Sequence, residues 1–135
     1  MNIQLDYSEL EKLVREKAGT ELHFQCQDSD TVKVNYPFKL MGRTSDVGIN
    51  LRVVSLEDND VKLSYSADGG ALVNMALGTI LNSYKSKFGD KASINGNEIT
   101  VHLDRIPQLA AKVAQYKLDS ICFNPSMAEI RLTER

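Results

Sequence analysis

The sequence predicts an α+β domain in which a mostly antiparallel, coiled sheet cradles one long central helix, with two shorter helices beside it. Three observations support this class. Apolar and polar residues alternate in many short stretches, as they do in half-buried strands. Short turn-like segments separate these stretches, as in antiparallel hairpins. The helical pattern over residues 68–89 is longer than any other in the chain.

The N-terminal part predicts a strand followed by a helix. Residues 2–5 alternate like a short strand. Asp6 and Glu9 are placed like a capping box for a helix, and Gly19 is suited to end it. The apolar residues at helical spacing predict the buried stripe of this helix, which we expect to contain Leu10, Leu13 and Val14.

Two hairpins are expected next. Residues 22–38 contain two alternating stretches with an acidic turn between them, and residues 47–67 contain a longer pair. In the longer pair, the apolar phase slips near Val53 and Val54 without a turn. Such a slip predicts a β-bulge and therefore a bent strand.

The central helix is predicted from its ends and from its spacing. Asp68 is a suitable N-cap, and Gly89 suits the position after the helix, where the left-handed conformation favours glycine. Between them, apolar residues recur on one face, so that a sheet must cover that face. This stripe consists of Val73, Ala76, Leu77, Ile80, Leu81, Tyr84 and Phe88.

The C-terminal part repeats the order found at the N-terminus. Residues 92–103 form a hairpin around the Asn95-Gly96 turn, a strong two-residue hairpin signal. Asp104 then caps a third helix, and residues 121–132 form a final hairpin. The shared order of strand, Asp cap, helix and hairpin predicts a pseudo-repeat of two similar units.

Length and composition limit the class of protein. The 135 residues predict a single domain over 1–135, and 42% hydrophobic with 25% charged residues is ordinary for a soluble protein. The net charge of −2 leaves no basic footprint, so we expect no nucleic-acid partner. No apolar run predicts a membrane span, and the start lacks the features of a signal peptide. We therefore expect a cytoplasmic protein, or an exported one if a signal peptide has been removed.

Two stretches resemble tubular lipid-binding (TULIP-like) modules and small bacterial domains similar to them. The first is GINLRVVSLEDNDVKLSYSADGG with the helix that follows it. The second is EITVHLDRIPQLAAKVAQYKLDSICFNPSMAEIRL, which is similar to the closing strand, helix and hairpin of those domains. The chain is shorter than a full tubular domain. The resemblance implies a long apolar helix on a coiled sheet, with an apolar lipid bound between the two.

No motif predicts catalysis, a metal or a cofactor. Residues 68–70 precede a helix but lack the spacing of a phosphate-binding loop, so a capped turn is favoured over an anion site. His23 and His102 fall in the outward phase of strands, and we expect exposed histidines that are not metal ligands. The acidic turns near Asp28 and Asp58 lack the loop of an EF-hand. A Ser-His-Asp set can be drawn in any chain of this length, and no nucleophile elbow supports one here. We therefore expect that the protein is not an enzyme.

The apolar face of the central helix is the candidate ligand site. These side chains either line a cavity against the sheet or simply pack against it. The residues concerned are Tyr36, Leu63, Tyr65, Leu77, Ile80, Leu81, Tyr84 and Phe88.

Met75 projects from the opposite side of the helix, near Gly78, and suggests a contact with another chain such as a homodimer partner. We therefore expect a non-catalytic interaction or scaffold module of a bacterial-type protein, which self-associates. The alternative is a carrier or binder of an apolar small molecule or lipid between helix and sheet. An enclosed apolar cavity beside the helix would favour the carrier. A packed core with an apolar outer patch would favour the module.

Overall fold

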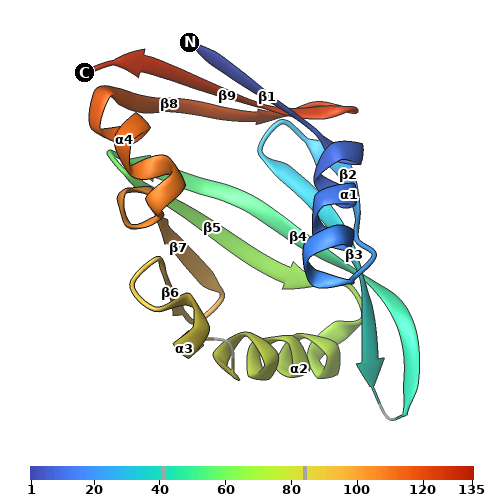
Figure 1. The fold of residues 1–135 in the computed structure, drawn as a ribbon. Coiled ribbons are helices and arrows are strands. Elements are labelled where there is room, and N and C mark those ends of the chain that lie inside the picture. The colour runs from blue at the N-terminus through green and yellow to red at the C-terminus, as the bar shows by residue number, and fades with distance from the viewer. Residues whose placement is uncertain (41, 84) are drawn as a thin grey trace.

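The computed structural model describes residues 1–40, 42–83 and 85–135 and has the predicted α+β class. All strand pairs are antiparallel, as expected from the short turns. The strands form two sheets instead of the single sheet that we expected. A three-stranded sheet has the order β1-β9-β8, and a six-stranded sheet has the order β2-β3-β4-β5-β7-β6 (Figure 1).

The elements have the following bounds. The small sheet consists of β1 (Asn2–Asp6), β8 (Tyr116–Phe123) and β9 (Met127–Glu134). The large sheet consists of β2 (His23–Asp28), β3 (Thr31–Leu40), β4 (Arg43–Glu57), β5 (Asp60–Ala67), β6 (Ala92–Asn95) and β7 (Glu98–His102). The helices are α1 (Tyr7–Ala18), α2 (Gly70–Ser83), α3 (Lys85–Phe88) and α4 (Pro107–Gln115), and Leu103–Arg105 forms a 3-10 turn.

Helix α1 confirms the predicted caps but corrects its buried stripe. The Asp6 carboxylate accepts a hydrogen bond from the backbone N–H of Ser8 at 2.9 Å, and Gly19 is left-handed with φ 68°. However, Leu13 is 47% exposed. The reason is that Tyr7 is buried and stacks on Phe24 of β2. This contact places the side of the helix that carries Tyr7 against β2. Leu13 lies to one side of that face on the helical wheel.

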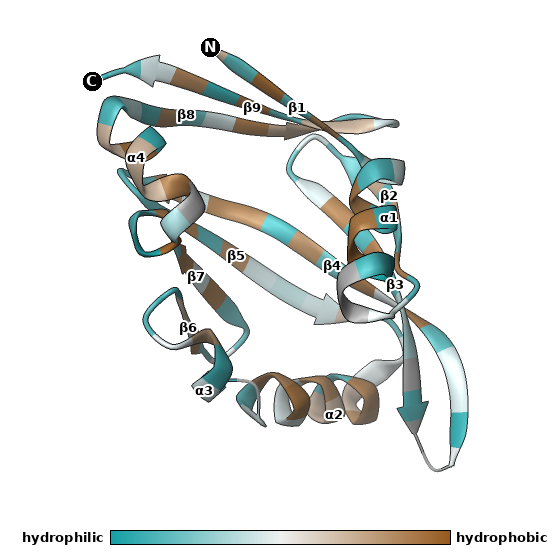
Figure 2. Cartoon of the chain, viewed as in Figure 1, coloured by the Kyte–Doolittle hydropathy of each residue, from teal (hydrophilic) through white to brown (hydrophobic). Residues whose placement is uncertain are grey.

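The large sheet has one apolar face and one polar face. On β5, Val61, Leu63, Tyr65 and Ala67 point to the apolar side, while the residues between them are polar. The predicted bulge in β4 is confirmed, because the register between β4 and β5 shifts between Val53 and Ser55. Two different covers therefore share one sheet face: the small sheet covers one end and α2 covers the other (Figure 2).

The predicted single long helix over 68–89 is not confirmed. Helix α2 begins at Gly70 and comprises 14 described residues, and α3 comprises four residues on the other side of position 84, which lies outside the described residues. Gly69 and Gly70 have φ values of 110° and 84°, so glycine is favoured at both positions of this strand-to-helix turn, and the helix begins one residue later than an N-cap at Asp68 predicts. Gly89 follows α3 with φ 60°, as expected for a residue that ends a helix.

The pseudo-repeat is also not confirmed as a symmetric unit. The N-terminal strand β1 belongs to the small sheet, and the hairpin after α1 belongs to the large sheet. For the second unit the assignment is the reverse, because β7 lies in the large sheet and the hairpin after α4 lies in the small one.

Within the described residues, no helix has the length and apolar character needed to cross a membrane.

Candidate functional site

The inner side of α2 is a packed cluster rather than an open lining. Leu77 is only 5% exposed and lies with Tyr65 in this cluster. Four other predicted lining residues pack around them: Tyr36, Ile80, Leu81 and Phe88. Leu63 lies instead in the cluster beneath the small sheet, because it sits nearer the other end of β5. Tyr84 lies outside the described residues.

Helix α2 is fixed to the sheet by a polar clamp that the sequence did not reveal. The side-chain amide of Asn74 accepts from the backbone N–H of Ala67 at 2.8 Å and donates to the Ala67 carbonyl at 2.9 Å. The same Nδ2 also donates to the Gly70 carbonyl at 2.8 Å. Asn74 thus pairs with both backbone groups of Ala67 at the end of β5, where a neighbouring strand would otherwise satisfy them.

The outer side of α2 is exposed and carries no charge. The helix reads GALVNMALGTILNS, without a single Asp, Glu, Lys or Arg, in a chain of which 25% is charged. On this side Leu72 is 56% exposed and Met75 is 71% exposed. A Cβ added to Gly78 would meet no described atom within 4 Å. Packing within the described chain therefore gives no reason for a glycine at this position in the helix.

An apolar hollow of about 130 Å³ lies elsewhere, between α4 and the two sheets. Its lining is apolar throughout, and Lys112 is the one charged residue among those that border it. The other residues around it are Ile3, Val61, Leu103, Leu109, Val113, Leu118, Ile121, Ile130 and Leu132. The predicted lining residues on α2 do not contribute to it. Small-molecule sites usually have volumes of about 300–1,000 Å³, so this hollow is small for a lipid.

The turn before α2 is held by an ion pair on the polar face of the sheet. The Asp68 carboxylate accepts from Lys33 Nζ at 2.9 Å and from Asn50 Nδ2 at 3.1 Å. These hydrogen bonds, that from Lys33 above all, hold the pKa of Asp68 below its ordinary value. The carboxylate therefore ties the turn to β3 and β4, whereas we expected it to cap the helix. A Cβ on Gly48 would lie 2.7 Å from the same carboxylate, which explains the glycine in β4.

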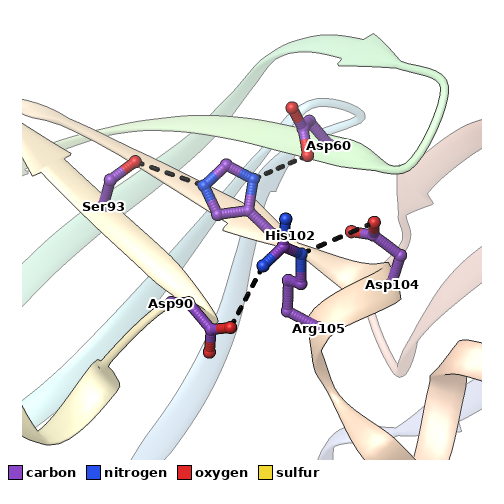
Figure 3. A network of polar contacts seen from close by, with 6 residues as sticks. All are labelled: Asp60, Asp90, Ser93, His102, Asp104 and Arg105. Atoms are coloured by element: carbon purple, nitrogen blue, oxygen red, sulfur yellow. Dashed lines mark hydrogen bonds and ion pairs between the residues drawn. The ribbon is translucent and has the colours of Figure 1, made fainter.

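A polar cluster lies at the opposite end of the large sheet, on the face opposite to the apolar side chains of β5. Figure 3 shows its side chains. His102 Nδ1 lies 2.7 Å from Asp60 Oδ1, and His102 Nε2 lies 3.5 Å from Ser93 Oγ. Arg105 pairs with Asp90 at 3.2 Å and with Asp104 at 3.8 Å beside them. These side chains border a hollow of about 440 Å³. His102 is thus partly buried and hydrogen-bonded, whereas we expected a freely exposed histidine.

The predicted acidic turns use their carboxylates for local contacts. Asp28 accepts from the backbone N–H of Asp30, and Asp58 pairs with Arg135 at 2.6 Å. Asp60, in the same turn region, belongs to the cluster around His102. Within the described residues, no three His, Cys, Asp or Glu side chains are grouped so that they could hold a metal ion.

Comparison of the chain with protein-family models, with curated proteins and with solved structures gave no match.

Sequence reasoning found the Met75 side of α2 but missed the two polar features. The Asn74 clamp is local, and an Asn early in a helix that follows a strand was a usable signal for it. The Asp60–His102 contact joins residues 42 positions apart. It depends on the pairing of β5 with β7, in which these two residues are direct partners. No local pattern contains that information.

Proposed function

We propose that this chain is an interaction module that associates with a second copy of itself through the outer side of α2. The observation that carries the proposal is the absence of charge from the whole of this 14-residue helix, together with the exposure of Leu72 and Met75. The exposed Leu72 and Met75 lie beside small polar residues such as Thr79 on the outer side. Exposed apolar patches with polar residues at their rim are typical of interaction surfaces. Charged residues are also depleted in the cores of protein interfaces, where Met is enriched.

Gly78 supports a close contact between helices. Glycine within a helix costs about 1 kcal/mol relative to alanine, and no described neighbour requires it here. In a two-fold symmetric contact, Met75 of one copy can pack over Gly78 of the other, and the reverse. Two such helices bury less than the roughly 800 Å² per partner of a standard interface, so we expect association only at micromolar or higher concentration.

The test is the mass in solution by light scattering at increasing concentration. We expect the wild type to approach the mass of a dimer and Met75→Lys to remain monomeric with an unchanged melting temperature, because a lysine in the contact would have to be desolvated. Leu13→Lys is the matched control, since it places the same charge on an exposed leucine of α1. A wild type that stays monomeric at all concentrations would refute the proposal. Equal loss of association in both variants would refute its location.

The second candidate function is a carrier of a small apolar molecule, supported by the apolar hollow between α4 and the sheets. At about 130 Å³ it is close in size to an engineered cavity of about 150 Å³ that binds benzene. The carrier would therefore accept a compact apolar group and not a whole lipid. Benzene titration followed by the melting temperature tests it, and no rise at saturating benzene would remove this candidate.

A further inference from the structure

Ser93, His102 and Asp60 come from three neighbouring strands at one end of the large sheet. Asp60 of β5 is the direct register partner of His102 of β7, and Ser93 of β6 is the partner of Thr100, two residues before His102. All three side chains lie on the face of the sheet that neither the small sheet nor α2 covers. Figure 3 shows the imidazole between the carboxylate and the hydroxyl.

The two contacts of His102 use different ring nitrogens. Nδ1 lies 2.7 Å from the Asp60 carboxylate, which can only accept, so Nδ1 is the nitrogen that carries the proton in the neutral ring. Nε2 then presents its lone pair toward Ser93 Oγ, at 3.5 Å. In this arrangement the carboxylate orients the imidazole, which is the general base, and the imidazole activates the hydroxyl as a nucleophile. The serine contact must shorten to about 3 Å for proton transfer, and such contacts are often looser without substrate.

We propose that Ser93 is an activated nucleophile that accepts acyl groups from small esters. In the first step, Ser93 Oγ bonds to the ester carbonyl carbon while its proton moves to His102 Nε2. The bond to the alcohol then breaks, and the alcohol takes the proton from Nε2 as it leaves. Water attacks the acyl-serine in the same manner, which releases the carboxylic acid and restores the serine. Asp60 is a positioning residue, because it acts only through the ring of His102.

The hollow beside Ser93 indicates which esters fit. Its volume of about 440 Å³ lies within the range of small-molecule sites. Three carboxylates border it, those of Asp60, Asp90 and Asp104, against the single guanidinium of Arg105. The excess negative charge attracts cations and repels anions. Esters with a positive charge in the alcohol part should therefore acylate Ser93 faster than neutral or anionic esters.

The experiment measures covalent labelling of the full chain with a fluorophosphonate, followed by mass spectrometry of the labelled peptide. The reagent forms an Oγ–P bond and releases fluoride. We expect one label, on Ser93, and a labelling rate about 100-fold lower in His102→Gln, since general bases contribute about 10²–10⁴. Ser66→Ala is the matched control, because Ser66 is an exposed serine of β5 on the same face of the sheet as Asp60. The labelling rate of this variant should equal that of the wild type. No label, label elsewhere, or an equal rate in His102→Gln would overturn the proposal.

A further arm separates catalysis from a purely structural role of the Asp60–His102 contact, and another tests the substrate class. Asp60→Asn should lower the maximal labelling rate while the half-saturating reagent concentration and the melting temperature stay the same. If only the melting temperature falls, the contact merely joins β5 to β7 and the activation is refuted.

For the substrate class, hydrolysis of 3-acetoxy-N,N,N-trimethylanilinium should exceed that of 3-acetoxybenzoate, and Ser93→Ala should abolish the difference. Equal rates for the two esters would refute the assigned charge preference.

Discussion

Replacing Asn74 by alanine tests how α2 is held to the sheet. The change removes three hydrogen bonds and leaves both backbone groups of the buried Ala67 without their partner. At about 1 kcal/mol net per hydrogen bond, the loss is about 3 kcal/mol. Alanine recovers up to about 0.7 kcal/mol because it forms helix better than asparagine. We therefore expect the free energy of unfolding to fall by about 2–3 kcal/mol.

The assay is urea denaturation at a low protein concentration, where the chain is monomeric. Asn82→Ala is the matched control: Asn82 is exposed on the same helix, so its replacement should change stability by no more than about 0.7 kcal/mol and in the stabilising direction. Asn74→Asp should destabilise at least as much as Asn74→Ala, since it places a carboxylate oxygen against the carbonyl oxygens of Ala67 and Gly70. The same midpoint and slope for Asn74→Ala and Asn82→Ala would show that the clamp contributes nothing to stability.

Three other changes address the core and the Asp68 turn. Leu77→Ala should cost about 2–5 kcal/mol in the same assay, because a buried leucine leaves a cavity; an unchanged midpoint would show that α2 is not packed on the sheet. Gly48→Ala should lower the midpoint by displacing the Asp68 carboxylate, and this loss should be smaller in an Asp68→Ser background, where only the contact with the Lys33 side chain remains. The lowered pKa of Asp68 means that its ionised form stabilises the fold above its unfolded pKa and that this contribution is lost as the pH falls through the lower folded value. The stability difference between wild type and Asp68→Asn should thus shrink below about pH 4, and a difference that stays constant under acid would contradict the pairing.

Features with a local cause could be predicted from the sequence. The Asp6 cap, the left-handed Gly19 and the bulge near Val54 depend on residues close together in the chain, and all three are confirmed. The buried position of Leu77 also follows from helical spacing alone. Leu13 fails because its exposure depends on how Tyr7 and Phe24 stack, which is a contact between different elements.

The division into two sheets had no local signal. Strand β1 pairs with β9 at the other end of the chain, with Ile3 opposite Ile130. Either strand alone has the same alternating pattern whichever sheet it joins. The cluster around His102 was missed for the same reason, since its residues meet only after β5, β6 and β7 have paired in register.

Gly78→Ala tests most directly whether the outer side of α2 is an interface, because the proposal predicts opposite signs for two quantities. The added methyl improves helix propensity and meets no described atom within 4 Å of its own chain, so the dilute monomer should become up to about 1 kcal/mol more stable. The same methyl prevents close approach of a second helix. Sedimentation equilibrium should therefore show a weaker dimer. A variant that is more stable and associates as well as the wild type would contradict self-association through α2.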